Sequence, residues 1–291
     1  MKIIDKLIQC KSRSDVFEFY PFGDVHVGSR ACAEKLLAKA VKEVAGNPNA
    51  YAFLGGDNIN AVIASDTKRF DFDTLPDWML EGKAVNTREM LNDILTQEVK
   101  RLTEIFLPIK DKLLGSIEGG HEYQIRKRHG TNLMGAYWNA LGAIDLTAEC
   151  MIRLRFKRLS STRTVFMYIR HGYGSGRTAG AEPMKLDRMV NEWELADICF
   201  SGHTHTADTP PPKPVLTLPA GGKLPEEFDC KYRWSGNWGC WVYSHPSGPS
   251  GYAGRACYPA RPMVTCKAVI KPFHNTAKSE RPHIEIRRIT M

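Results

Sequence analysis

The sequence predicts an α/β protein in which β-strands alternate with helices along most of the chain. Short runs of β-branched and aromatic residues, at 16–20 and 51–54, are followed at once by polar loops that contain glycine. Segments with apolar residues at helical spacing separate such runs, at 33–45 and 87–106. In open α/β sheets, ligands bind beyond the carboxyl ends of the strands. We therefore expect the polar loops to converge at one edge.

The first half of the chain contains three units of strand and polar loop. Strands are expected at 16–20, 51–54 and 112–117, and each ends in a glycine-containing loop. The helix at 33–45 should stop at Gly46-Asn47-Pro48-Asn49, because glycine and proline end helices. Residues 60–85 carry acids and aromatics without sustained periodicity, so an inserted loop or lid is expected there.

The second half of the chain changes pattern. Residues 152–157 alternate between apolar and basic side chains and are followed by a turn and a second apolar run at 165–169, which predicts a hairpin. A glycine-rich loop from His171 to Gly180 comes next, then a helix at 184–195 and a strand at 197–200. The prolines at 210–212 predict an extended link, and a last strand is expected at 284–287.

Composition gives the chain a basic balance. The 291 residues include 40 Lys and Arg and 32 Asp and Glu, which gives a formal net charge of +8. This charge favours an anionic partner such as nucleic acid, although a solvated basic surface has the same composition. No run of 18 apolar residues and no signal-peptide core are present, so we expect a cytoplasmic protein without a membrane partner.

The eight cysteines contain no C-x-x-C pair, the strongest local sign of a structural zinc site. Four of them fall in or beside predicted core segments and are expected to be buried reduced thiols: Cys10, Cys32, Cys150 and Cys199. The other four crowd the C-terminal part, where a zinc site or disulfides stay open as alternatives: Cys230, Cys240, Cys257 and Cys266.

Five loops that follow predicted strands carry side chains suited to metal ligation. In chain order these are Asp24 with His26, Asp57, His121, His171, and His203 with His205. Asp-x-His and His-x-His place alternate side chains of an extended segment on the same side, so both members can reach one cluster. Carboxylate and imidazole together suit manganese, iron or zinc, and a carboxylate can bridge two ions.

These motifs resemble those of the calcineurin-like metallophosphoesterases. The matching segments, in the order of that family, are Gly23-Asp24-Val25-His26, Gly56-Asp57-Asn58, Gly120-His121-Glu122, His171-Gly172 and Gly202-His203-Thr204-His205. The resemblance covers roughly residues 15–210. It implies a four-layered α/β/β/α sandwich with two mixed β-sheets, formed by a single domain over residues 1–291. Residues 15–210 would be its metal-binding core, and residues 211–291 would complete the sandwich with strands and loops.

The resemblance also implies a role for each motif residue. Asp24, His26 and His205 would hold one divalent metal ion, Asp57 would bridge, and His171 and His203 would hold the second. Manganese is favoured, with iron or zinc as alternatives. His121 would face the substrate and stabilise the transition state or protonate the leaving oxygen, with Glu122 orienting its ring. Water activated between the two ions would attack phosphorus without a covalent enzyme intermediate.

Gly120 departs from the family pattern, in which an asparagine at this position completes the second metal site. Asn58, Asn60, a water molecule or a substrate oxygen are candidates to fill the place. The expected consequence is a weaker or more exchangeable second metal. The alternative consequence is a catalytically impaired descendant that keeps the fold as a binding scaffold.

For function, the metal chemistry and the basic balance together favour a phosphodiesterase or nuclease acting on nucleic acid or nucleotides. The alternative enzyme is a phosphomonoesterase acting on phosphoprotein or a small metabolite. Arg126 and Arg177 are the candidate substrate contacts. The loop around Arg177 also resembles a pattern in phosphoesterases of bacteriophages, which hints at a viral origin and a host cytoplasm location. C-terminal aromatics such as Trp238 and Trp241 suit either base stacking or, more commonly, a core.

Overall fold

The structure is a computed structural model that describes residues 1–63, 65–66, 70–80, 93–174, 180–217, 229–244, 262–275 and 280–291. Its strands form two sheets. The seven-stranded sheet has the order β1-β5-β6-β7-β10-β8, with β9 paired to β10, and the five-stranded sheet has the order β12-β11-β2-β3-β4. Both sheets are mixed, since parallel pairs such as β6 with β7 and β2 with β3 lie next to antiparallel pairs.

The strands are β1 (Lys2–Gln9), β2 (Phe17–Phe22), β3 (Ala50–Leu54), β4 (Leu113–Ser116), β5 (Glu149–Arg158), β6 (Ser161–Arg170), β7 (Ile198–Ser201), β8 (Ala207–Asp208), β9 (Lys213–Thr217), β10 (Asp229–Trp238), β11 (Val264–Asn275) and β12 (Glu280–Thr290). The α-helices are α1 (Glu34–Gly46), α2 (Asp77–Leu80), α4 (Ile94–Phe106), α5 (Gly120–His129), α6 (Leu133–Leu141) and α7 (Ala181–Glu192). Two 3-10 helices are η1 (Phe72–Thr74) and η2 (Leu107–Lys112).

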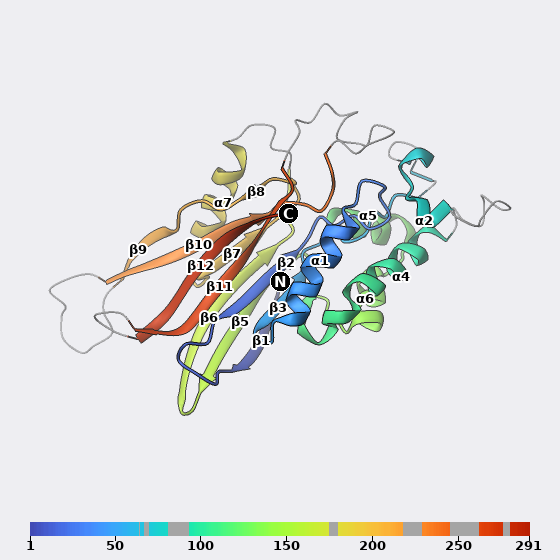
Figure 1. Ribbon diagram of the computed structural model, residues 1–291. Helices are drawn as coiled ribbons and strands as arrows, with labels where there is room; N and C mark the ends of the chain where they lie inside the picture. The colour runs from blue at the N-terminus through green and yellow to red at the C-terminus, as the bar shows by residue number, and fades with distance from the viewer. Residues whose placement is uncertain are drawn as a thin grey trace.

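Helices cover the outer side of each sheet (Figure 1). Leu37 and Val41 of α1 and Leu102 of α4 pack in one cluster with Tyr20 of β2 and Ala52 of β3, against the five-stranded sheet. On the other side of the molecule, Leu186, Met189 and Val190 of α7 pack against Tyr168 and Cys199 of the seven-stranded sheet. The predicted α/β/β/α sandwich is therefore confirmed.

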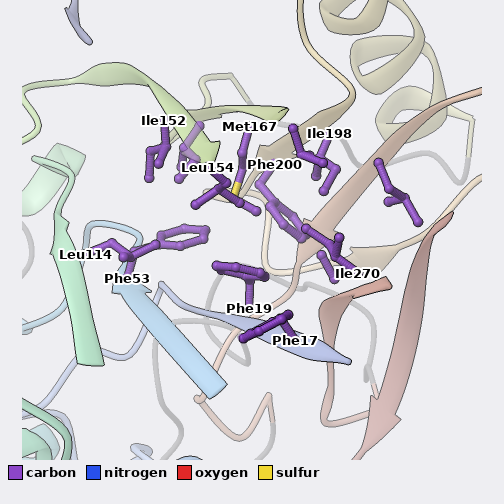
Figure 2. Packing of buried hydrophobic residues seen from close by; sticks show 14 of the residues in the cluster. Phe17, Phe19, Phe53, Leu114, Ile152, Leu154, Met167, Ile198, Phe200 and Ile270 are labelled. Atoms are coloured by element: carbon purple, nitrogen blue, oxygen red, sulfur yellow. The ribbon is translucent and has the colours of Figure 1, made fainter. Parts of the chain in front are cut away.

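The largest core cluster lies between the two sheets (Figure 2). Phe17, Phe19 and Phe53 of the five-stranded sheet meet residues such as Met167 and Phe200 of the seven-stranded sheet, and all five side chains are at most 1% exposed. Burial of such apolar side chains is the main force that holds the sheets together. The strand ends above this core are consequently fixed relative to one another.

Most predicted elements occur close to their expected bounds. The helix expected at 33–45 is α1, the hairpin is β5 with β6, and the strand at 197–200 is β7. The helix expected at 87–106 is described from Ile94 onward, and its earlier residues fall in 81–92, outside the described ranges. The described parts of 60–85 contain only the short helices η1 and α2, as expected of an insertion.

Two expectations about local structure were wrong or incomplete. The segment after β4 was expected to form a glycine-rich turn, but Gly120 and His121 open helix α5, whose cap residue is Gly119. Strand β1 was not predicted. It lies at the edge of the seven-stranded sheet, parallel to β5, and its burial pattern is mostly exposed.

Strands after residue 210 enter both sheets, β10 in the seven-stranded sheet and β11 and β12 in the five-stranded sheet. Among the described residues, Cys10, Cys32, Cys150, Cys199, Cys240 and Cys266 form no disulfide, and Cys257 falls outside the described ranges. Within the described parts of the chain, none of the helices combines the length and apolar character needed to cross a bilayer.

Candidate metal centre

Four strand ends deliver the candidate ligands to one edge of the sandwich. Asp24 follows β2, Asp57 follows β3, His171 follows β6 and His203 follows β7. Since β2 is parallel to β3 and β6 is parallel to β7, the carboxyl ends within each pair point the same way. Backbone hydrogen bonds then join the loops: the Asp24 amide donates to the Gly56 carbonyl at 2.9 Å, and the Gly202 amide to the His171 carbonyl at 2.9 Å.

Six side chains meet there in two groups of three. The Asp24 group consists of Asp24, His26 and His205, and the Asp57 group consists of Asp57, His171 and His203. Within each group one possible ligand atom from every residue lies within 4.8 Å of the others. The family resemblance implied a division in which Asp24, His26 and His205 hold one ion, His171 and His203 hold the second, and Asp57 bridges; that ligand assignment stays a prediction. Among the described residues, neither group includes a cysteine.

In the Asp24 group, the ligand atoms point at one another. His26 Nε2 lies 3.2 Å from His205 Nε2, and His205 Nε2 lies 3.3 Å from Asp24 Oδ1. The other oxygen, Asp24 Oδ2, accepts hydrogen bonds from the His203 amide at 2.9 Å and from the Trp238 indole at 2.8 Å. Asp24 Oδ1 is buried and accepts no hydrogen bond from the described residues, so it is available to a cation.

The Asp57 group has the same construction. His171 Nε2 lies 3.2 Å from Asp57 Oδ2 and 3.3 Å from His203 Nδ1. His171 Nδ1 lies 2.9 Å from the Gly55 carbonyl, which only accepts hydrogen bonds, so Nδ1 carries a proton and donates it. That bond directs Nε2 toward the group, as a carbonyl partner does for metal-binding histidines.

The backbone is strained at five of the six residues. Asp24, His26, Asp57, His203 and His205 have φ of 50, 52, 49, 73 and 57°, in the left-handed region that side chains other than glycine rarely adopt. Such conformations cost about 1–3 kcal/mol each and cluster at functional sites, where the surrounding structure enforces them. The strain marks these loops independently of any motif.

Charges inside the group shift the pKa values of its members. Burial alone would lower the pKa of His171, but the carboxylates of Asp57 and Asp24 outweigh it and raise the pKa to about 10. Burial likewise opposes ionisation of Asp57, yet His171 and His121 hold its pKa well below the ordinary value. Burial lowers the pKa of His26 to about 3, so this imidazole is neutral and free to bind a metal.

The donor chemistry of both groups fits divalent transition metals. Each group offers one carboxylate and two imidazoles, a combination that suits manganese, iron or zinc. The facing ring nitrogens lie 3.2 and 3.3 Å apart, so one nitrogen of each pair can donate a proton to the other, or a cation can accept the lone pairs of both neutral rings. Asp24, His26 and His205 would hold one ion, and Asp57, His171 and His203 a second.

His121 lies beside these groups on the first turn of α5. Its ring centroid is 4.8 Å from that of His26, its amide donates to Asp57 Oδ1 at 2.7 Å, and its Nδ1 contacts the Asn60 carbonyl. Because a carbonyl only accepts, Nδ1 carries the proton and Nε2 is left to exchange one with a substrate. His121 is absent from both three-residue groups, in agreement with a role other than ligand.

Glu122 does not orient the His121 ring, contrary to the expectation. Its carboxylate is buried and accepts hydrogen bonds from the amides of Asp57 at 2.9 Å and Asn58 at 2.8 Å. The ring of His121 is held by Asn60 instead. Helix geometry explains the difference, because adjacent helical side chains diverge and do not face each other. Glu122 therefore positions the loop that carries Asp57.

Gly120 lies beside Asp57 with room for a Cβ atom. A Cβ atom built at Gly120 would lie 3.8 Å from Asp57 Oδ1, an ordinary van der Waals contact. The side-chain nitrogen of Asn58, a candidate replacement ligand, lies 3.4 Å from Ser116 Oγ and 3.3 Å from Glu122 Oε1. Asn58 is fully buried, and its side-chain oxygen accepts no hydrogen bond from the described residues.

Of the two candidate substrate contacts, Arg126 lies within the described residues and Arg177 does not. Arg126 is on α5, where it forms a two-pronged ion pair with Glu118 at 2.6 and 2.8 Å and lies over the Tyr123 ring. Its guanidinium is thus engaged within the protein. Arg177 lies outside the described residues.

Sequence reasoning missed the residues that support the ligand loops from below. Trp238 on β10 is fully buried and donates to Asp24, and the neighbouring Asn237 donates to the Gly202 carbonyl at 3.2 Å and to Glu182 at 2.6 Å. Burial of Trp238 and Trp241, at 0% and 1% exposure, excludes them as base-stacking platforms. The available signal was the glycine that precedes the ligand in three motifs, since a repeated glycine indicates close approach of another group.

Comparison with known proteins gives structural neighbours only. No protein-family model and no curated protein matches the sequence. Similar solved structures include a conserved uncharacterized protein of Streptococcus pneumoniae TIGR4, described as a predicted phosphoesterase, with 12% identity, coverage of 95% of this chain and 99% of that one, and a TM-score of 0.33. Chaetomium thermophilum Vps29 has 10% identity, coverage of 94% and 98%, and a TM-score of 0.35.

The NAD nucleotidase of Haemophilus influenzae is a third such structure. It has 9% identity and a TM-score of 0.41, and the match covers 95% of this chain but 50% of the nucleotidase. At these TM-scores similarity assigns no function by itself.

Proposed function

We propose that this chain is a metal-dependent hydrolase of phosphoric esters. The observation that carries the proposal is the pair of adjacent groups, each with one carboxylate and two imidazoles, beside a histidine that belongs to neither. Two divalent ions held there would polarise the phosphoryl oxygens and lower the pKa of a bound water molecule.

The residues around the ions have separate tasks. Asp24 and Asp57 supply the negative charge that binds the cations, and burial of both carboxylates keeps that charge unscreened by water. The Gly55 carbonyl fixes the tautomer of His171, and the Asn60 carbonyl fixes that of His121. Protonated at Nε2 as well, His121 would donate that proton to the leaving oxygen of the ester.

We further propose that the substrate is a phosphodiester of nucleic acid or of a nucleotide. The net charge of +8 supports an anionic partner. The last turn of α5, the helix that begins beside the metal groups, carries Lys127 next to Arg126 and Arg128, which pair with Glu118 and Asp66. Lys127 and the exposed parts of the two guanidinium groups supply positive charge that favours a polyanion extending away from the reacting phosphate.

Hydrolysis of two nitrophenyl esters tests the proposal. The protein loaded with Mn²⁺ should cleave the bis-nitrophenyl phosphate diester faster than the nitrophenyl monoester, and a chelator should abolish both activities. The Asp57→Asn variant keeps the side-chain shape but removes its charge, and should lose about 100-fold or more in rate.

A matched control is Asp187→Asn, since Asp187 is an exposed residue of α7 that pairs with Lys213 on the surface. Faster cleavage of the monoester would replace the diester proposal by a phosphomonoesterase. Equal activity of wild type and Asp57→Asn would contradict a metal centre at these residues. Single-stranded DNA, duplex DNA, RNA and cyclic nucleotides then identify the substrate class.

A further inference from the structure

Three loops that carry candidate metal ligands pack against the indole ring of Trp238. A Cβ atom at Gly23 would lie 2.3 Å from Trp238 Nε1, one at Gly202 would lie 2.1 Å from the same atom, and one at Gly55 would lie 2.8 Å from Trp238 Cζ2. None of these three glycines has a φ in the left-handed region. The ring of Trp238, and not the backbone conformation, is therefore what requires glycine at all three positions.

Each of these glycines closely precedes a candidate metal ligand. Gly23 stands before Asp24, Gly202 before His203, and Gly55 two residues before Asp57. The Trp238 ring is 0% exposed and comes from β10, which pairs in parallel with β7 through Asn237 and Ser201. The ring thus touches loops from both sheets, and its position fixes the spacing of those loops.

The same ring also selects which oxygen of Asp24 faces the metal group. Trp238 Nε1 donates to Asp24 Oδ2 at 2.8 Å, and the His203 amide donates to the same oxygen at 2.9 Å. With two donors on Oδ2, the lone pairs of Oδ1 are the ones left toward His205. A carboxylate without these donors would be free to rotate about its last bond.

We infer that Trp238 is a positioning residue of the metal centre, whose indole N–H and ring hold Asp24 in the orientation that binds metal. The inference rests on the proposed metal centre and adds a residue that no motif of the sequence indicates. Partners behind a ligand typically change metal affinity 10- to 100-fold when they are removed.

The test compares two tryptophan variants by Mn²⁺ titration of the metal-free protein, with calorimetry or equilibrium dialysis. Trp238→Phe removes the N–H and keeps a buried ring. Trp241→Phe is the matched control, since Trp241 is 1% exposed and its indole N–H has no hydrogen-bond partner among the described residues. Trp238→Phe should weaken one of the two Mn²⁺ sites about 10- to 100-fold, whereas Trp241→Phe should leave both affinities unchanged.

A second pair of variants tests the contact between Trp238 and the ligand loops without changing the tryptophan. Gly202→Ala places a methyl group against Trp238 and should lower Mn²⁺ affinity. Gly46→Ala is its control, because a Cβ at Gly46 meets nothing within 4 Å. Circular dichroism of all four variants establishes that the fold is retained.

The outcomes separate this inference from the proposed function. Wild-type protein that binds two Mn²⁺ ions while Trp238→Phe and Gly202→Ala bind both as tightly would overturn the role of Trp238 and leave the metal centre intact. Wild-type protein that binds no Mn²⁺ would overturn the metal centre, and the inference with it.

Discussion

The Nε2 atoms of His26 and His205 face one another at 3.2 Å, although 179 residues separate them in the chain. At this distance one nitrogen can donate its proton to the other, or the lone pairs of both deprotonated nitrogens can bind one cation. Asp24 Oδ1, buried and without a hydrogen-bond donor among the described residues, faces the same point. The backbone is strained at all three residues, and a bound cation, as proposed above, would account for the arrangement.

Metal uptake is expected to release protons. Burial would lower the pKa of His171, but Asp57 and Asp24 outweigh it and raise that pKa to about 10. The His171 imidazole is therefore protonated in metal-free protein at pH 7.5 and must lose a proton to bind metal. Calorimetric Mn²⁺ titrations in two buffers of different ionisation enthalpy should show release of about one proton.

The pH dependence follows from the sign of these shifts. Proton release should decrease as the pH approaches 10, because His171 then loses its proton before the metal arrives. His26, whose pKa is lowered to about 3 by burial and by nearby histidines, contributes no proton at neutral pH. Metal binding at pH 7.5 without proton release would contradict the assignment of His171 as a ligand.

Glu122→Gln should destabilise the protein much more than Glu118→Gln, four residues away. The Glu122 carboxylate accepts from the amides of Asp57 and Asn58 and from Gly119 at 3.2 Å, and a glutamine would turn an NH₂ group toward some of these donors. A buried donor without a partner costs about 1–3 kcal/mol of unfolding free energy. Urea unfolding at pH 7 measures the difference.

Glu118 is the matched control because its partner Arg126 is 50% exposed and stays hydrated when the carboxylate is replaced, although Glu118 itself is 10% exposed. Loss of such an ion pair typically changes the unfolding free energy by less than about 1 kcal/mol. Equal destabilisation by the two substitutions would show that Glu122 does not support the loop that carries Asp57.

The effect of Glu98→Gln on the free energy of unfolding should become more favourable as the pH rises. Glu98 on α4 is fully buried and accepts from the Ala61 amide at 2.9 Å, and burial raises its pKa well above the ordinary value of 4.5. Above pH 4.5 the unfolded chain loses this proton and the folded protein keeps it, so wild-type stability falls with pH until the folded pKa is passed. A glutamine stays neutral at every pH, so the Glu98→Gln variant does not lose stability in this way.

The difference in unfolding free energy between Glu98→Gln and wild type should therefore rise by up to about 1.4 kcal/mol per pH unit above pH 4.5. Glu104→Gln on the same helix is the control, since Glu104 is half-exposed beside Arg101. Urea unfolding between pH 4.5 and 8 provides the comparison. A difference that stays constant with pH would show that Glu98 is ionised in the folded protein.

The fold class and the ligand groups were predictable because their signals are local. Strand β2 and its loop to Asp24, or β7 and its loop to His203, are each a run of apolar residues followed directly by polar ones. Parallel pairing of such strands brings their loops together, so order along the chain translates into proximity. This rule brings residue 24 beside residue 57, and residue 171 beside residue 203, because each pair follows parallel neighbours of one sheet.

Features that depend on distant contacts were not predictable. Helix α5 carries charged residues on several faces and lacks an apolar stripe, so Gly119 and Gly120 indicated a turn. Glu122 contacts the amides of residues 57 and 58, which its place after His121 does not indicate. Trp238 lies 214 residues from Asp24 in sequence, and one tryptophan among several C-terminal aromatics carries no sign of its partner.

Anomalous scattering from crystals equilibrated with Mn²⁺ tests the central claim most directly. Two manganese peaks are expected, one among Asp24, His26 and His205 and the other among Asp57, His171 and His203. The peaks should lie about 3.5–4 Å apart, the separation typical of two-metal hydrolytic sites. Manganese peaks only elsewhere on the protein, or none at all, would contradict the assignment of these six residues as a metal centre.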